Sequence, residues 1–318
     1  MLCLLCPNHC LIDEGGVGRC LGRGVQEGSM RLRNYARVVA ASVDPVEKKP
    51  LYHLFPGQPV YSIGSYGCNL RCRFCQNADI SQHQQPSEEI MPAQLVSEAV
   101  SIKDNIGVAF TYNEPGIWYE YILDCAPLLK AAGLMTIMVT NGYLCENPWK
   151  NLCRVVDAMN IDLKAFNNDF YKNICGGHLE TVKTNIKTAV NAGVHVELTN
   201  LVVTGLNDDE EEFKKMVKWV ADLSDTIPFH ISRYFPRYLE TAVQTPSATI
   251  NRFVELAREH LKYVYPGNLP ANQDTRCPDC GALWVKRDHY NTVVVRRETV
   301  CECGLRLPFF NRKESSIV

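Results

Sequence analysis

The fold is decided by the stretch Gly67-Cys68-Asn69-Leu70-Arg71-Cys72-Arg73-Phe74-Cys75-Gln76-Asn77. Its three cysteines lie within eight residues, so one short loop can direct three soft thiolates toward a compact iron–sulfur cluster. A [4Fe–4S] cube takes four ligands, so one iron stays open, as one position does in catalytic zinc sites. The alternative is a zinc ion completed by a distant cysteine. The CxxxCxxC spacing, with Phe74 before the last cysteine, favours the cluster.

Apolar segments alternate with helical patterns along most of the chain, which predicts an α/β fold with parallel winding. The expected strands lie at 60–64, 107–112, 134–140, 157–163, 194–203 and 228–234. The expected helices lie at 92–104, 117–132, 147–154, 179–192, 208–223 and 247–262. Six such strand–helix units predict a partial (β/α)6 barrel.

Polar residues stand at the carboxyl ends of these strands. In a β/α barrel, these ends line one shared mouth, so their side chains are expected to converge on one site. Solvation of a loop would explain any one of them alone, but their common register favours a shared site. The residues concerned are Asn113, Glu114, Asn141, Asp162, Lys164, Asn200, His230 and Arg233.

An amino-terminal group of cysteines forms a second candidate metal site. Cys3, Cys6, Cys10 and Cys20 offer four thiols in 18 residues, and four soft ligands can close a structural or electron-transferring site. Zinc and a second [4Fe–4S] cluster both fit this set. The Cys6-Pro7 pair and the glycine-rich return before Cys20 favour zinc.

A carboxyl-terminal group, Cys277, Cys280, Cys301 and Cys303, brackets a strand-like segment at 283–297 and predicts a zinc ribbon. Its second pair is CxC rather than CxxC, which strains tetrahedral geometry without forbidding it. The alternative is a degenerate ribbon that binds no metal. Basic residues near the ribbon are expected to form a solvated face; these are Lys286, Arg287, Arg296 and Arg297.

Composition sets the remaining bounds. The 318 residues carry a net charge of −2 and are 46% hydrophobic, as in a globular protein without a basic field for nucleic acid. No signal peptide is expected, because the start of the sequence is short and rich in cysteine, and no apolar run reaches membrane-spanning length. The 15 cysteines indicate metal ligands in a reducing compartment, so a cytoplasmic location is expected. Three units are expected: an N-terminal Cys-rich metal-binding module at 1–50, the partial barrel at 51–265 and a zinc-ribbon-like module at 266–318.

The sequence resembles a known family. Its CxxxCxΦC loop after the first strand is the signature of radical S-adenosylmethionine (SAM) enzymes. The wider sequence is similar to the AmmeMemoRadiSam-system radical SAM enzymes, relatives of the pyruvate formate-lyase-activating enzymes. The segments that carry this resemblance include Asp44-Pro-Val-Glu-Lys-Lys-Pro-Leu51, Thr111-Tyr-Asn-Glu-Pro115, Ile161-Asp-Leu-Lys164 and Phe229-His-Ile-Ser-Arg233.

The resemblance implies SAM contacts at two strand ends. Tyr112, Asn113 and Glu114 stand where the family has a Gly-Gly-Glu segment that takes the SAM amino group. The glycines are replaced here, but the carboxylate that an ammonium group needs is kept as Glu114. Thr140 and Asn141 match the next strand end that contacts SAM.

Further contacts are implied at later strands. Asp162 and Lys164 match an Asp-Leu-Lys element that reaches the ribose and the carboxylate of SAM. Asn200 lies on the strand that contacts the ribose, and His230 matches a histidine near SAM. For His230, a satisfied core histidine is the alternative.

The implied activity is reductive cleavage of SAM at the [4Fe–4S] cluster, followed by hydrogen abstraction from an unidentified substrate. An electron donor such as flavodoxin or ferredoxin would be required, and zinc is expected beside the cluster and SAM. One version is a glycyl-radical-enzyme activase that acts on a partner protein; another modifies a small molecule, a peptide or an RNA base. The competing class is a non-catalytic metal-binding module. The joint presence of Glu114, Asp162 and Lys164 argues against it, because a decayed site would not be expected to keep all three.

Overall fold

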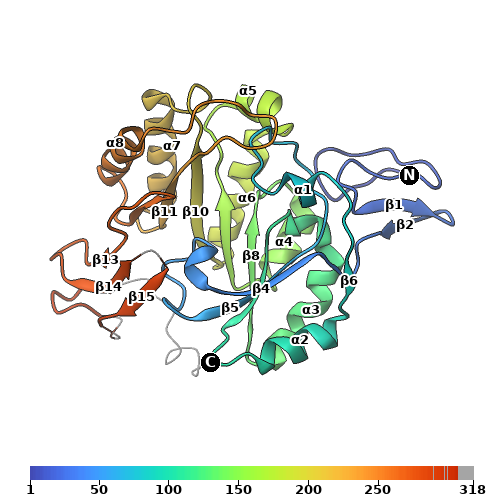
Figure 1. The fold of residues 1–318 in the computed structure, drawn as a ribbon, viewed down its shortest axis with the longest axis horizontal. Helices are drawn as coiled ribbons and strands as arrows, with labels where there is room; N and C mark the ends of the chain where they lie inside the picture. Colours follow the sequence, from blue (N-terminus) through green and yellow to red (C-terminus); the bar gives the residue numbers. More distant parts are fainter. Residues whose placement is uncertain (289, 297, 299, 307–318) are drawn as a thin grey trace.

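The structure is a computed structural model that describes residues 1–306 except 289, 297 and 299. Its centre is an eight-stranded sheet in the order β12-β11-β10-β9-β8-β7-β5-β4 (Figure 1). Neighbouring strands run parallel, except that β4 is antiparallel to β5. The strands are β4 (Ala40–Pro45), β5 (Pro59–Gly64), β7 (Gly107–Phe110), β8 (Met135–Thr140), β9 (Ala158–Asp162), β10 (His195–Val202), β11 (Phe229–Arg233) and β12 (Val264–Gly267).

Helices connect the parallel strands and pack on the sheet: α3 contacts β7 and β8, α6 contacts β10, and α8 contacts β11 and β12 (Figure 1). The α-helices are α1 (Ala78–Ser81), α2 (Pro92–Ser101), α3 (Tyr119–Ala131), α4 (Glu146–Cys153), α5 (Asn168–Phe170), α6 (Leu179–Asn191), α7 (Glu210–Leu223) and α8 (Ser247–Arg258). Shorter turns are η1 (Val46–Lys48), η2 (Pro115–Trp118) and the π-helical η3 (Tyr171–Cys175). Among the described residues, no helix is both long enough and apolar enough to cross a membrane.

Helix α7 shows how local sequence sets these elements. The Asp209 carboxylate caps it by accepting a hydrogen bond of 2.7 Å from the backbone N–H of Glu212. The negative charges of three glutamates in the first turn interact favourably with the positive end of the helix dipole. Phe213, Met216 and Val217 are buried on one face, and capping by Asp209 starts the helix two residues after the predicted position 208.

The prediction of an α/β partial barrel is confirmed. Each of the six predicted strands overlaps a parallel strand of the sheet, in chain order. Strands β4 and β12 were missed. β4 is a half-exposed edge strand without an apolar run, and β12 has four residues that include Pro266.

Two smaller structures lie on opposite sides of the molecule (Figure 1). A hairpin of β1 (Arg23–Gln26) and β2 (Ser29–Leu32) follows the amino-terminal cysteines, and β3 (Arg37–Val38) pairs with β6 (Glu88–Glu89). The other structure is a three-stranded sheet of β13 (Thr275–Arg276), β14 (Leu283–Asp288) and β15 (Asn291–Val294). Residues 40–45 of the predicted 1–50 module belong to the central sheet, and the three-unit division stays a prediction. Residues 307–318 of the predicted last module lie outside the described residues.

The prediction of a solvated basic face is wrong for Arg287. Its guanidinium is fully buried, lies 4.4 Å from the centroid of the Tyr52 ring, and donates to the Tyr52 carbonyl oxygen at 2.7 Å. The Nε atom is 3.6 Å from Oε1 of Glu47, which is also fully buried. Strand alternation turns Arg287 inward, while Lys286 beside it stays exposed. Arg297 lies outside the described residues.

Replacing Arg287 with methionine is expected to lower the free energy of unfolding by about 3–5 kcal/mol, because Glu47 would remain buried without its partner. Urea unfolding followed by circular dichroism measures this change. Lys286→Met on the same strand is the matched control and should shift stability by no more than about 0.5 kcal/mol. Equal stability of the two variants would contradict the buried role assigned to Arg287.

Candidate active site

A cavity of about 400 Å³ opens at the carboxyl ends of the parallel strands, within the range of small-molecule sites. Its wall combines the cysteine loop after β5 with residues at the ends of β7, β8, β9, β10 and β11. The structure therefore brings together ten of the site residues predicted from sequence. They are Cys68, Cys72, Cys75, Tyr112, Asn113, Glu114, Thr140, Asn141, Asp162 and Lys164.

The cysteine loop is fixed by its backbone and by its apolar side chains. The N–H groups of Arg71 and Arg73 donate to the carbonyl oxygens of Cys175 and Ile174, at 2.7 and 3.1 Å. Phe74 is buried and contacts Phe170, with ring centroids 5.9 Å apart. Phe74, the residue before the last cysteine, therefore anchors the loop, and the cysteine thiols line the cavity.

The three thiols differ in their surroundings. Burial, and then the Glu114 carboxylate, raise the pKa of Cys68 well above its ordinary value. Burial also raises the pKa of Cys75, whose Sγ lies 3.2 Å from the hydroxyl of Ser81. A hydrogen bond from Cys175, a residue outside every cysteine group of the sequence, lowers the pKa of Cys72.

Glu114 is buried beside the thiols and is held by three donors. Its Oε1 accepts from the N–H of Gly116 and the hydroxyl of Thr140, and its Oε2 accepts from the N–H of Asn141, each at 2.7 Å. Burial raises the pKa of Glu114 to about 7, although these hydrogen bonds oppose the shift. A cation in the cavity would favour its ionised form.

Asp162 and Lys164 form an ion pair that also lines the cavity. The Lys164 Nζ atom lies 2.7 Å from Oδ2 of Asp162. Burial alone would lower the pKa of Lys164, but the Asp162 carboxylate raises it well above its ordinary value. The pair therefore presents a fixed positive and a fixed negative charge to the cavity.

Asn113 and Asn141 connect the strand ends to the cysteine loop. Asn113 Nδ2 donates to the Gly67 carbonyl oxygen at 2.9 Å, and its Oδ1 accepts from the N–H of Ser65 at 3.0 Å. Asn141 Nδ2 donates to Oδ1 of Asn69 at 2.9 Å and lies 3.6 Å from Sγ of Cys68. Both amides thus position the loop as well as line the cavity.

Two predicted SAM contacts, Asn200 and His230, do not line this cavity. Asn200 Nδ2 donates to the carbonyl oxygen of Leu163 at 2.9 Å. His230 is buried, with its Nε2 2.7 Å from Oε2 of Glu197, which matches the alternative of a satisfied core histidine. Alternation along β10 explains Asn200, because its neighbours Thr199 and Leu201 line the cavity instead.

Sequence reasoning missed a basic corner of the cavity formed by Lys48 and Lys49. Both lysines contact Asp44, at 3.0 and 2.9 Å. Burial alone would raise the pKa of Asp44, but hydrogen bonds from Lys49 and Lys48 lower it to about 2. The signal was present in the Asp44–Leu51 stretch, one of the segments that carry the family resemblance.

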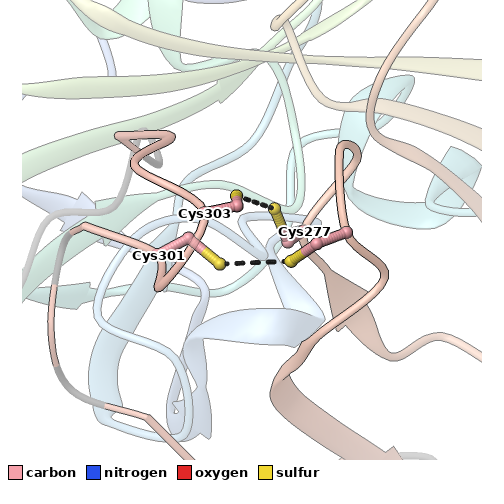
Figure 2. A group of neighbouring side chains, drawn as sticks. Cys277, Cys301 and Cys303 are labelled. Atoms are coloured by element: carbon pink, nitrogen blue, oxygen red, sulfur yellow. Dashed lines mark hydrogen bonds between the residues drawn. The ribbon is translucent and has the colours of Figure 1, made fainter.

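The carboxyl-terminal cysteines form a compact cluster. The ligand atoms of Cys277, Cys280, Cys301 and Cys303 all lie within 4.8 Å of one another. Figure 2 shows the side chains of Cys277, Cys301 and Cys303 gathered at this cluster. The Sγ atoms of Cys277 and Cys303 are 3.6 Å apart, and those of Cys280 and Cys301 are 3.4 Å apart. Tetrahedral zinc with bonds of about 2.3 Å needs sulfur atoms about 3.8 Å apart, so the set could bind a metal such as zinc despite its short second knuckle.

We expect metal analysis to find about one zinc per chain at this cluster and none there in Cys280→Ser, because one tetrahedral ligand is lost. Cys153→Ala removes a cysteine outside the three groups and should retain the zinc. A stable wild-type protein with essentially no zinc would instead identify a ribbon that binds no metal.

The Radical SAM superfamily sequence model matches residues 62–220. The chain belongs to the radical SAM superfamily. This radical SAM protein is 40% identical over 302 residues to the uncharacterized protein MJ0808 of Methanocaldococcus jannaschii, covering 92% of this chain and 89% of that protein. It is 26% identical over 174 residues to the pyruvate formate-lyase-activating enzyme of Clostridium pasteurianum, covering 52% of this chain and 72% of that enzyme.

Solved structures share the fold of this radical SAM protein. A radical SAM methyltransferase from Sphaerobacter thermophilus superimposes with a TM-score of 0.52 at 17% identity, covering 72% of this chain and 71% of that one. TYW1 with a lysine-pyruvate adduct bound gives a TM-score of 0.51 at 15% identity, covering 73% and 89%. At these identities the likeness concerns the fold alone.

Membership in the superfamily implies a [4Fe–4S] cluster and SAM, and the site fits both. Cys68, Cys72 and Cys75 provide three soft ligands at one wall of the cavity. Glu114 and Lys164 provide the charges that complement an amino group and a carboxylate. The donor set therefore suits a cluster with one open iron beside an amino-acid-like ligand.

Proposed function

We propose that this protein is an enzyme that reductively cleaves SAM and uses the product to abstract hydrogen from a substrate. The cluster, when bound, supplies the electron that splits SAM into methionine and the 5′-deoxyadenosyl radical. The observation that supports the proposal best is the single cavity shared by the three cysteines, Glu114 and Lys164.

The residues of this chain have distinct roles in the proposal. Glu114 binds the ammonium group of SAM, and Thr140 and Asn141 hold that carboxylate in place. Lys164 binds the SAM carboxylate, and Asp162 orients Lys164 and accepts from ribose hydroxyls. Asn200 and His230 act at a distance, as supports of the strand ends rather than as SAM contacts.

We place the protein among the AmmeMemoRadiSam-system enzymes of the cytoplasm, supplied with electrons by a flavodoxin or ferredoxin. The similarity to a pyruvate formate-lyase-activating enzyme favours one further candidate, an activase that abstracts hydrogen from a glycine of a partner protein. A glycyl-radical signal on a partner after incubation with SAM would select the activase. Radical products on a small molecule or RNA base, without that signal, would select the other branch.

Calorimetry with SAM tests the enzyme against a non-catalytic metal-binding module. The protein reconstituted with iron and sulfide under anaerobic conditions is expected to bind SAM, and the same protein stripped of iron is not, because the open iron is part of the site. Absence of binding to the reconstituted protein would favour the non-catalytic module.

A further inference from the structure

One charged part of the cavity has no role in the proposed binding of SAM. In that proposal, Glu114 takes the ammonium group of SAM and Lys164 takes its carboxylate. The basic corner formed by Lys48 and Lys49 stays unused, although both lysines line the same cavity. Their two ammonium groups share the single carboxylate of Asp44, so the corner carries one positive charge in excess.

Lys49 is the buried member of the corner. Its side chain is 5% exposed, and its Nζ atom lies 2.9 Å from Oδ2 of Asp44. A lysine ammonium has three N–H donors, and among the described residues Asp44 is the one hydrogen-bond acceptor of Lys49. Burial lowers the pKa of Lys49, the Asp44 carboxylate opposes this shift, and the charge of Lys48 adds to it. A further anion in the cavity would therefore stabilise the ammonium group.

The Asp44 carboxylate cannot supply that further negative charge, because its acceptor sites are already occupied. A carboxylate offers about four such sites. The hydrogen bonds to Asp44 come from the Ser42 hydroxyl at 3.5 Å, Lys48 at 3.0 Å, Lys49 at 2.9 Å and the Tyr112 hydroxyl at 3.1 Å. Asp44 thus holds both ammonium groups in place and leaves their remaining donors to the cavity.

Tyr112 completes the corner and has an unusual backbone. Its φ is +69°, in the left-handed region that residues other than glycine rarely adopt. The centroid of its ring lies 4.8 Å from Nζ of Lys49. A Cβ atom on Gly64 would lie 2.9 Å from Cδ2 of Tyr112, so the ring fits there because position 64 is glycine. Backbone strain of this kind gathers at functional sites, which points to a binding role for this corner.

The register of β4 places the corner deep in the barrel. Asp44 on β4 pairs with Val60, near the amino end of β5, whereas the cysteine loop follows the carboxyl end of β5. One cavity reaches both levels, because it is lined by Lys49 as well as by Cys68. The end of a small molecule can reach an ammonium group at this depth, whereas a protein or RNA chain would have to enter the barrel.

We propose that Lys48 and Lys49, held in place by Asp44 and Tyr112, bind an anionic group of the substrate, which rests on the proposed function. The substrate class is a small molecule that carries a carboxylate or a phosphate, since either group accepts charge-assisted hydrogen bonds from two ammonium groups. The substrate extends from the corner toward the cysteine loop, where SAM is bound. This inference favours the small-molecule branch of the proposed function over the activase.

Equilibrium dialysis tests the anion site without any assay of activity. The probes are inorganic phosphate and acetate, and each is added to reconstituted protein saturated with SAM, so that Lys164 and the open iron are already occupied. We expect saturable binding of at least one probe. The probe that binds more tightly identifies the group, phosphate or carboxylate, that the corner takes.

Lys48→Gln is the main variant, because Lys48 is exposed and its loss leaves the buried pair of Lys49 and Asp44 intact. Its affinity for the bound probe should fall by at least about tenfold, the worth of a hydrogen bond to a charged group. Lys150→Gln is the matched control, since Lys150 is also exposed and pairs with a carboxylate four residues earlier in the sequence. A wild type that binds neither probe, or a Lys48→Gln protein that binds as tightly as the control, would overturn the subsite.

Anion exchange links the site to the substrate. A small-molecule extract of cells that contain the protein is separated on an anion-exchange resin, and each fraction is added to the enzyme with SAM and titanium(III) citrate. The retained fraction should increase 5′-deoxyadenosine formation by the wild type and by Lys150→Gln, and the increase should be at least about tenfold smaller in Lys48→Gln. An increase with the unretained fraction alone, or with no fraction, would overturn the anionic substrate.

These outcomes separate the inference from the proposed function. A wild type that cleaves SAM but binds neither probe would overturn the subsite and leave SAM cleavage standing. A wild type that binds a probe through Lys48 but leaves SAM intact would contradict the proposed function and support the anion site, because dialysis requires no cleavage of SAM.

Discussion

Replacing Cys75 with alanine is expected to reduce 5′-deoxyadenosine formation to the background seen without protein. The thiol is one of three that line the cavity, and it follows Phe74, whose burial fixes the loop. Loss of one of three protein ligands leaves a second iron without a thiolate, so the cluster should assemble poorly or not at all. Chromatographic analysis of the nucleoside after anaerobic incubation with SAM and reductant measures the effect.

The matched control is Cys153→Ala, which removes a cysteine from the opposite, amino end of the sheet. Cys153 is buried and lines a separate cavity with residues such as Asp157 and Val194. This variant should form 5′-deoxyadenosine at close to the wild-type rate, with stability lowered by about 1 kcal/mol. A Cys75→Ala protein as active as this control would contradict the assignment of the cluster ligands.

Replacing Glu114 with glutamine is expected to weaken SAM binding by about 10- to 100-fold, the worth of a hydrogen bond to a charged group. The carboxylate of Glu114 accepts hydrogen bonds from the N–H of Gly116, the hydroxyl of Thr140 and the N–H of Asn141. The glutamine amide would place its NH2 group against at least one of these donors. Calorimetry on the reconstituted protein measures the affinity. Glu146→Gln, at an exposed carboxylate of α4, is the control and should leave the affinity unchanged.

The pH dependence of SAM binding follows from the same residue. Burial raises the folded pKa of Glu114 from 4.5 to about 7, so ionising it lowers the stability of the free protein as the pH rises through this window. An ammonium ligand needs the ionised form. SAM affinity should therefore fall by up to about tenfold per pH unit below about pH 7, and this slope should be absent in Glu114→Gln. The same slope in both proteins would remove Glu114 from the ammonium site.

Much of the site could be predicted because it is local in the sequence. The cysteine spacing needs only one loop, and the polar residues that follow β7, β8 and β9 meet because parallel strands end at one edge. Glu114 and Lys164 therefore lie where strand order alone puts them.

The structure differs from the sequence-based expectation where side-chain direction or a distant segment decides. Side chains alternate in direction along β10, so Thr199 and Leu201 line the cavity while Asn200 between them does not. Arg287 is buried because it contacts the Tyr52 carbonyl oxygen and the Glu47 carboxylate, two groups that are far away in the sequence. Such contacts depend on how modules pack on the sheet, which hydrophobic periodicity does not encode.

The contact between the amino-terminal cysteines and the catalytic loop is of the same kind. Sequence indicated a four-thiol site but not its neighbour, because Asn8 and Asn69 are 61 residues apart.

The most direct measurement is the yield of nucleoside and amino acid from SAM. The wild-type protein, reconstituted and reduced under anaerobic conditions, should form 5′-deoxyadenosine and methionine in equal amounts, and Cys75→Ala should form neither above background. A cluster-loaded wild-type protein that leaves SAM intact with both flavodoxin and titanium(III) citrate would contradict the account.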